Sequence, residues 1–233
     1  MTTTSVPSVL VFDVNETLLD IESMAPLFKQ LFGDERMLRE WFAQLVMYSM
    51  AITLADNYVT FPVLAQGVLR MLGEIYQVDV TQDDLDRLKA ELLTMPAHPD
   101  ATHGLVALRD NGFRLVALTN SPPNPDGPTA LQHSGLGDFF EHQLSVDARS
   151  AFKPSPGVYR SVCETLGVAP ADCMMVAAHV WDTIGAQNVG FSGALITRRG
   201  NAPLPVDGLS QPNIVVSDVR QLAEQLINGS AEY

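Results

Sequence analysis

Four short apolar runs, separated by segments long enough for helices, constrain the fold of this 233-residue chain more than any other feature. The first, SVLVFD at residues 8–13, ends in an acid and is typical of a strand buried on both faces of a parallel sheet. The others are FRLVALT at 113–119, CMMVAA at 173–178 and GALIT at 193–197. Such runs indicate βα units, so we expect an α/β fold with a doubly wound parallel sheet.

The segment between the first two runs shows helical patterns instead. Apolar residues recur there at helical spacing, for example Met37, Leu38, Trp41 and Leu45. The breaker-rich stretch MPAHP ends the segment, and we expect Asp100 to cap a helix that runs to Asn111-Gly112. We therefore predict a helical cap at 20–99, inserted into a core of residues 1–19 and 100–233 that closes with a short strand at 214–216 and a helix from Ser217.

Charge and composition exclude several classes of protein. The formal net charge of −13, with no basic stripe, disfavours binding to nucleic acids and to anionic membranes. The first residues, MTTTSVPS, lack the basic and apolar regions of a signal peptide, and no apolar run approaches a membrane span, so we expect a cytoplasmic protein. Cys163 and Cys173 have no metal-ligand spacing and are expected to be reduced and structural.

Polar side chains gather where the predicted strands end. Ligands of open parallel sheets bind beyond the carboxyl ends of the strands. Asp13 ends the first strand and Thr119-Asn120 the second, and a loop with Lys153 precedes the next helix. His179, Trp181 and Asp182 follow the strand after it. We expect these four loops to converge on one site.

These residues fall in four ordered motifs. FDVNETL at residues 12–18 resembles the DxxxT motif of the haloacid dehalogenase superfamily, and Thr119-Asn120 resembles the second motif. Lys153-Pro154 resembles the third motif and residues 176–182 the fourth, at spacings that cover nearly the whole chain. The resemblance implies a Rossmann-like core with an inserted helical cap, and Asp13 as the nucleophile.

Two positions argue against the phosphatases of this superfamily. A phosphatase needs a second acid two residues after the nucleophile to protonate the leaving oxygen, and here that residue is Asn15. The acid that usually holds magnesium in the fourth motif is Ala178, and Lys153 would compete with a cation. We therefore expect a reaction without metal or other cofactor.

The remaining pattern is similar to the type II, or L-2-haloacid dehalogenase, branch. The segments at residues 57–61, 145–159 and 181–186 all resemble it. The resemblance implies that Asp13 displaces halide from C2 of a small carboxylate and forms an ester. Water then attacks the Asp13 carboxyl carbon and releases a 2-hydroxy acid. Homodimers are common in this branch, so a homodimer is a further expectation.

The resemblance also implies a role for each site residue. Lys153, between Asp13 and Asp182, is expected to keep Asp13 ionised. Asp182 is expected to orient or deprotonate the water, which Thr17 helps to hold. Thr119 and the backbone amides after Asp13 would bind the substrate carboxylate. The expected substrate-binding set comprises Val14, Asn15, Thr119, Asn120, Phe42, Phe61, His179, Trp181 and Tyr159, of which Asn120, Phe61 and Trp181 form the halide cradle and Tyr159 donates a hydrogen bond behind the site.

The chain departs from the branch at four positions. An arginine on a cap helix usually meets the leaving halide, but alignment through residues 58–61 places Phe42 there. Asn15 replaces an aromatic residue, and Ala177 and His179 replace a serine and an asparagine that hold water. Losing the cation removes stabilisation of the developing charge. His179 would replace a lost donor toward either the water or the leaving group.

Three interpretations of these departures stay open. The first is a dehalogenase with a rebuilt pocket for haloacetates, fluoroacetate included, or (S)-2-haloalkanoates. The second is a hydrolase that opens a strained ring such as azetidine-2-carboxylate. The third is a phosphatase-like or inactive relative that binds a small carboxylate.

Plainer structural roles are also open to some of these residues. Asp182 can cap the helix that follows it, and His179 can be a satisfied core group. Helical spacing favours core positions for Trp41, Phe42, Met47 and Met50, and we expect surface positions for His98, His103, His133 and His142.

Overall fold

The computed structural model describes residues 7–230, so the first six and last three residues of the predicted core lie outside the described part. Six parallel strands form one sheet. They are β1 (Val9–Phe12), β2 (Arg114–Thr119), β3 (His142–Ser145), β4 (Cys173–Ala177), β5 (Ser192–Ile196) and β6 (Ile214–Val216). Their order is β3-β2-β1-β4-β5-β6, so the direction of strand addition reverses at β1. This reversal creates the crevice in which open α/β sheets bind ligands.

The central strands are buried as the sequence predicts. All four residues of β1 and all five of β4 are buried, and Val9 pairs with Arg114 of β2 on one side and Cys173 of β4 on the other. Strand β3 is absent from the prediction because its sequence, HQLS, is polar and half exposed at the edge of the sheet. An edge strand with solvent on both faces lacks the apolar signal used to find strands.

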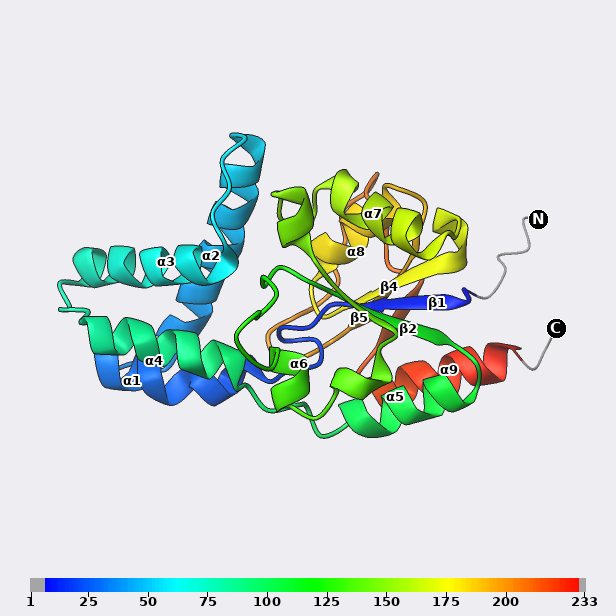
Figure 1. Ribbon diagram of the computed structural model, residues 1–233, viewed down its shortest axis with the longest axis horizontal. Helices are drawn as coiled ribbons and strands as arrows, with labels where there is room; N and C mark the ends of the chain where they lie inside the picture. The colour runs from blue at the N-terminus through cyan, green and yellow to red at the C-terminus, as the bar shows by residue number, and fades with distance from the viewer. Residues whose placement is uncertain (1–6, 231–233) are drawn as a thin grey trace.

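Helices cover both faces of the sheet (Figure 1), with α7 and α8 on one side and α5 and α9 on the other. The core helices are α5 (Ala101–Asp110), α6 (Ala130–His133), α7 (Pro156–Leu166), α8 (Val180–Gln187) and α9 (Val219–Ser230), with the 3₁₀ helices η2 (Gly137–Phe139), η3 (Val146–Arg149) and η4 (Pro170–Asp172). Helices α5 and α9 pack so closely that a Cβ on Gly104 would lie 2.7 Å from the backbone carbon of Val219. A side chain at residue 104 would therefore push α9 away from the core.

A second group of helices stands to one side of the sheet (Figure 1) and forms the predicted helical cap. It comprises the 3₁₀ helix η1 (Ile21–Met24) and helices α1 (Ala25–Phe32), α2 (Met37–Leu54), α3 (Phe61–Tyr76) and α4 (Gln82–Leu93). Trp41 is fully buried among these helices, and its indole nitrogen donates to the Ala65 carbonyl at 3.1 Å. The cap thus has an apolar centre of its own.

The cap also rests on the core beside the strand ends. The Tyr58 hydroxyl donates to Asp147 at 2.9 Å, and the Phe152 backbone amide donates to the Thr53 hydroxyl at 3.0 Å. The Phe152 ring lies 5.0 Å from Tyr58 and 6.0 Å from Phe61 between ring centroids. These contacts hold α2 and α3 over the carboxyl edge of the sheet. Among the helices of residues 7–230, none has the length and apolar character needed to cross a bilayer.

Candidate active site

Asp13 lies directly beyond β1, where the strand order reverses. Its backbone amide donates to the Val176 carbonyl of β4 at 2.9 Å, which extends the strand pairing by one residue. The side chain is 6% exposed. Its Oδ2 accepts a 2.7 Å hydrogen bond from Thr17, whose hydroxyl in turn accepts from the Ala178 amide at 2.8 Å. Thr17 therefore fixes the carboxylate and ties the loop after β1 to the end of β4.

Lys153 carries the buried cation of the site. Its Nζ donates to Asp13 Oδ1 at 2.7 Å, to Asp182 Oδ2 at 2.6 Å and to the Leu118 carbonyl at 3.1 Å. The side chain is fully buried. Burial lowers the pKa of Lys153, but the charges of Asp13 and Asp182 outweigh burial and raise it above its ordinary value. Lys153 is therefore charged at neutral pH, and each of its three protons has an acceptor.

Asp182 is enclosed behind this cation. It lies in the first turn of α8, but its carboxylate bonds to side chains: Oδ2 to Lys153, and Oδ1 to the Tyr159 hydroxyl at 2.7 Å. Burial, together with the charge of Asp13, raises the pKa of Asp182 although Lys153 lowers it. Burial likewise raises the pKa of Tyr159 well above its ordinary value, so the phenol stays a donor.

A small cavity opens above Asp13. Its volume is about 10 Å³, on the order of the space that one water molecule needs. The lining residues are Asp13, Asn15, Phe42, Val46, Phe61, Asn120, His179 and Trp181. Seven of these eight are predicted site residues, and Val46 of α2 is the one that the sequence analysis missed. Asn120 accepts from the Lys153 backbone amide at 3.2 Å through Oδ1, which leaves its NH₂ group for the cavity.

Three predicted substrate-binding residues do not line this cavity. Val14 and Thr119 line another cavity of about 90 Å³, and Asn15 borders both. The Thr119 hydroxyl accepts from the Ser121 amide at 3.1 Å. Tyr159 is fully buried against Asp182 and contributes only from behind. The spacing in sequence places these residues near the strand ends, but only packing decides which of two adjacent cavities a side chain borders.

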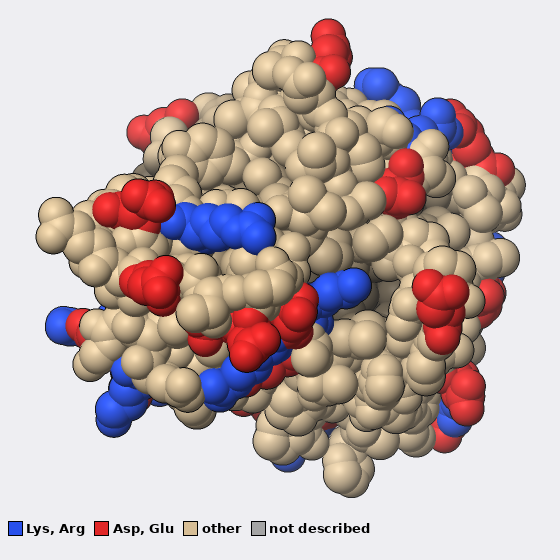
Figure 2. All heavy atoms as spheres, turned by 60° about the vertical axis from the view of Figure 1, so that its left-hand side comes forward, with Lys and Arg blue, Asp and Glu red and all other residues tan. Residues whose placement is uncertain are grey.

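A groove of about 740 Å³ adjoins the cavity and runs along α2. Phe42, Val46, His179 and Trp181 line both, so they form the boundary between them. The prediction of core positions holds for Trp41 and Phe42, which are both buried in the core, and Phe42 lines the cavity as well. It is wrong for Met47, which is 49% exposed, and Met47 and Met50 both line the groove. The face that carries the cap is hollowed (Figure 2), and acidic and basic side chains are interspersed on it.

Glu16 and Arg39 form a charged pair that the sequence analysis missed. Glu16 lies inside the DxxxT motif with a left-handed backbone (φ 67°) and is 1% exposed. Its Oε1 accepts from Arg39 of α2, and its Oε2 lies 2.8 Å from His179 Nε2. The sequence offered one signal for this pair: Glu16 is an acid in the loop directly after a buried strand. A carboxylate buried in such a loop requires a charged or hydrogen-bonding partner.

His98 is a correction to the predicted surface histidines. It is half-buried, and its Nε2 lies 3.0 Å from the Glu16 carbonyl. Burial lowers the pKa of His98, and Arg198 lowers it further. The other three, His103, His133 and His142, are exposed as predicted. The difference arises because the breaker-rich stretch before Asp100 packs against the loop after β1.

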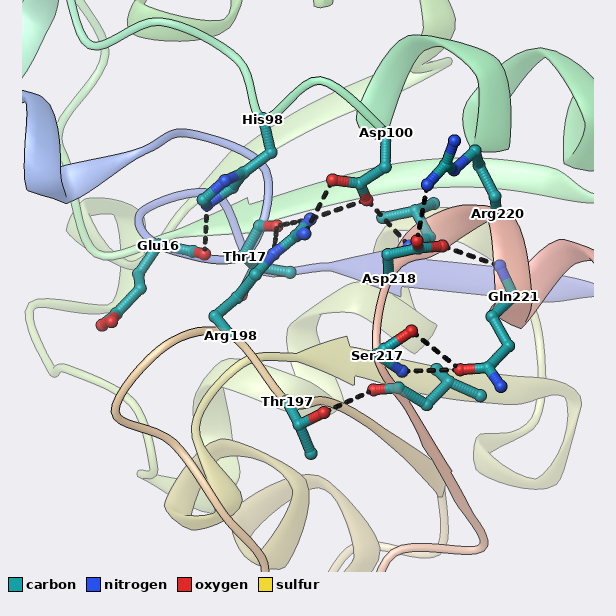
Figure 3. Close-up of polar contacts among 12 residues, drawn as sticks. Glu16, Thr17, His98, Asp100, Thr197, Arg198, Ser217, Asp218, Arg220 and Gln221 are labelled. Carbon is teal, nitrogen blue, oxygen red and sulfur yellow. Dashed lines mark hydrogen bonds and ion pairs between the residues drawn. The ribbon is translucent and has the colours of Figure 1, made fainter.

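Arg198 supports the same loop from the opposite side (Figure 3). Its guanidinium donates to the Thr17 carbonyl at 3.1 and 2.8 Å and to the Asp100 carboxylate at 2.7 and 2.9 Å. Asp100 precedes α5 as predicted, yet its side chain accepts from the Val219 amide at the start of α9, at 2.9 Å, instead of capping α5. Arg198 thus joins the loop after β1 to two core helices.

Replacing Arg198 with Gln is expected to lower the free energy of unfolding by about 3 kcal/mol, since it leaves the buried Asp100 carboxylate without its cation. Burial raises the pKa of Asp100, but Arg198 and the Val219 amide hold it below its ordinary value of 3.8. A carboxyl group whose pKa is lower in the folded than in the unfolded state stabilises the fold at pH values above its unfolded-state pKa. This stabilisation is lost as the pH falls through the folded-state pKa. In urea unfolding, the difference in the free energy of unfolding between the variant and the wild type should therefore be large at pH 7 and smaller near pH 3. Arg220→Gln, which removes a cation from an exposed ion pair, should leave the urea midpoint unchanged. If this control lost as much stability as Arg198→Gln, the structural role given to Arg198 would be contradicted.

Among residues 7–230, no group of three or more His, Cys, Asp or Glu side chains is arranged to hold a metal ion. The position between Asp13 and Asp182 is taken by the Lys153 ammonium group. What the arrangement can do chemically is present a fixed carboxylate, paired with a buried cation, to a small cavity with a histidine and an amide beside it. Such a site suits nucleophilic catalysis.

Comparison with known proteins agrees with this geometry. The family of haloacid dehalogenase-like hydrolases matches residues 7–190. The (S)-2-haloacid dehalogenase 4A of Burkholderia cepacia is 31% identical over 83% of this chain and 84% of its own, and the haloacetate dehalogenase H-2 of a Moraxella strain is 28% identical over 83% and 87%. The L-2-haloacid dehalogenase of Xanthobacter autotrophicus, solved with chloropropionic acid covalently bound, superposes with a TM-score of 0.83 at 26% identity, over 96% of this chain and 99% of its own.

An α/β core with a helical cap and a buried carboxylate at the strand reversal is the arrangement of a class of hydrolases. This chain belongs to the haloacid dehalogenase superfamily and, within it, to the branch of the 2-haloacid dehalogenases.

Proposed function

We propose that this protein hydrolyses small 2-haloacids to 2-hydroxy acids through an ester on Asp13. The observation that carries the proposal is the row of charges Asp13, Lys153 and Asp182, with Asp13 alone of the three bordering the cavity. A carboxylate held ionised by a buried cation and open to a small cavity is suited to attack carbon. The covalently bound chloropropionic acid in the Xanthobacter autotrophicus relative supports the same intermediate here.

In the first half-reaction, a carboxylate oxygen of Asp13 forms a bond to C2 of the substrate while the carbon–halogen bond breaks and its electron pair leaves with the halide. The leaving halide would lie among Asn120, Phe61 and Trp181, where an amide N–H and ring edges present partial positive charge. Phe42 also lines this space and brings no charge. We therefore propose that neutral donors and rings, instead of a guanidinium, receive the halide.

In the second half-reaction, water attacks the carboxyl carbon of the Asp13 ester. We assign the proton acceptor to His179, because it borders the cavity beside Asp13, whereas both oxygens of Asp182 are occupied by Lys153 and Tyr159. The water proton passes to the His179 ring as the hydroxide oxygen bonds to the Asp13 carboxyl carbon. When the ester C–O bond breaks, His179 returns this proton to the departing alkoxide oxygen, the 2-hydroxy acid leaves, and the remaining carboxyl proton passes to solvent as Asp13 is restored to a carboxylate. Asp182 then serves to hold Lys153.

The test is halide release from chloroacetate, fluoroacetate and both enantiomers of 2-chloropropionate in EDTA, followed with ion-selective electrodes. We expect turnover of at least one substrate and no dependence on added magnesium. Phosphate release from an aryl phosphate that requires magnesium, without halide release, would overturn the proposal. Opening of azetidine-2-carboxylate without halide release would instead favour the ring-opening alternative. The homodimer and the cytoplasmic location remain predictions from the sequence.

A further inference from the structure

Glu16 holds a carboxylate where the site has no direct use for one. It is almost fully buried, adopts a left-handed backbone that disfavours side chains, and does not border the cavity above Asp13. Its two oxygens face two different partners, Arg39 and His179. A buried acid kept in a strained backbone, in contact with a residue of the cavity wall, indicates a role in setting the state of that residue.

His179 packs between two aromatic rings. Its ring stacks on Trp181 with centroids 5.3 Å apart and an interplanar angle of 24°, and it lies 5.5 Å from the Phe42 ring. Its Nε2 lies 2.8 Å from Glu16 Oε2, a close contact without the geometry of a regular hydrogen bond. Glu16 therefore acts on the ring through its charge at close range.

Arg39 reaches Glu16 from the cap. It extends from α2, and its guanidinium also donates to Glu22 at 2.7 Å and to the Arg199 carbonyl of the core at 3.0 Å. Burial raises the pKa of Glu16, but His179 and Arg39 outweigh it and lower the pKa below its ordinary value. Burial lowers the pKa of Arg39, while Glu16 and Glu22 raise it above its ordinary value. The pair is therefore ionised wherever the protein is folded at neutral pH.

We propose that Arg39 is a positioning residue which, by neutralising Glu16, keeps His179 unprotonated and able to accept the proton of the hydrolytic water. The inference rests on the proposed function. It links the proton acceptor, His179 of the core, to the guanidinium of Arg39, which belongs to the cap. Seating of α2 on the core would thereby complete the base.

The direction of the effect follows from the charges. An ionised Glu16 beside the ring favours imidazolium, and the Arg39 cation opposes this both by pairing with Glu16 and by repelling a positive ring. The other charges near the ring are Asp13 across the cavity and Lys153, whose Nζ lies 5.9 Å from the Trp181 ring. These two pair with each other, which leaves Glu16 and Arg39 as the opposed charges acting on His179.

The experiment measures the rate of ester hydrolysis in single turnovers as a function of pH. In Arg39→Gln, the acidic limb of the profile should move to higher pH by about one unit. At a given pH on that limb, the rate of ester hydrolysis should therefore fall roughly tenfold. The rate at high pH should equal that of the wild type. In Glu16→Gln the limb should move to lower pH. Arg39→Lys should keep the wild-type limb. Arg36→Gln, which removes a charge at an exposed pair directly before α2, is the matched control and should leave the profile unchanged.

An Arg39→Gln variant whose hydrolysis rate falls by the same factor at every pH, or whose pH profile is unchanged, would overturn the inference. A readout that does not require turnover separates this outcome from failure of the proposed function. The ¹H–¹³C signal of the His179 ring, assigned by its loss in His179→Asn, should titrate at higher pH in Arg39→Gln and at lower pH in Glu16→Gln. If halide is not released but these opposite shifts appear, the proposed function fails and the charge coupling stands.

Discussion

Asp13→Asn is expected to lower the rate of halide release by on the order of 10⁴-fold or more, the scale of removing a covalent nucleophile. The amide keeps the shape of the side chain but lacks the negative charge that makes a carboxylate oxygen nucleophilic enough to attack C2. Halide release measured by ion-selective electrode should fall to background. Asp110→Asn, the same change at an exposed position, is the control and should retain full activity.

A labelling experiment tests the same residue in the native protein. In a single turnover in H₂¹⁸O, water attacks the Asp13 carboxyl carbon, so the label should enter the peptide that contains Asp13, and the first product molecules should carry ordinary oxygen. Mass spectrometry of a proteolytic digest reads both. Label in the first product and none in Asp13 would mean direct attack of water on the substrate, and would contradict the nucleophile assignment.

Lys153→Met is expected to lower the free energy of unfolding by about 3–5 kcal/mol, because it leaves two buried carboxylates without their shared cation. Halide release should be lost as well, since Asp13 loses the partner that keeps it ionised. Urea unfolding followed by circular dichroism measures the first effect, and the electrode assay measures the second.

The pH dependence of this variant has a definite sign. Burial already raises the pKa of Asp182, and loss of Lys153 removes the group that lowers it. A carboxyl pKa raised in the folded state favours folding at low pH, and this stabilisation is lost as the pH rises through that value. The stability gap between Lys153→Met and wild type should therefore narrow as the pH falls. A second change, Asp182→Asn, should recover part of the stability at pH 7 without restoring activity; a further loss in the double variant would contradict the shared-cation description.

Much of the fold follows from local pattern. The strand that ends at Asp13 is apolar in all four residues, which suits only a position buried on both faces, and α2 shows its buried stripe through Leu38, Trp41 and Leu45. The edge strand β3 was missed because a half-exposed strand carries no such pattern. The spacing of apolar residues along the sequence shows which residues are buried. An edge strand instead forms because a neighbouring strand offers unpaired backbone groups, and these leave no pattern in the side chains.

The positions of Asp13, Lys153 and Asp182 in the sequence are enough to predict that they meet, since each follows or approaches the carboxyl end of a strand in one sheet. The sequence does not show which side chains border the cavity above Asp13, because Val14 and Asn15 are adjacent in sequence, yet Asn15 borders this cavity and Val14 borders only the neighbouring one. Only the tertiary structure joined Arg39 to Glu16, 23 residues apart, and Arg198 to Asp100, 98 residues apart. Such pairs depend on where the cap and the closing helices pack, and a charge has no periodic pattern that shows its distant partner in advance.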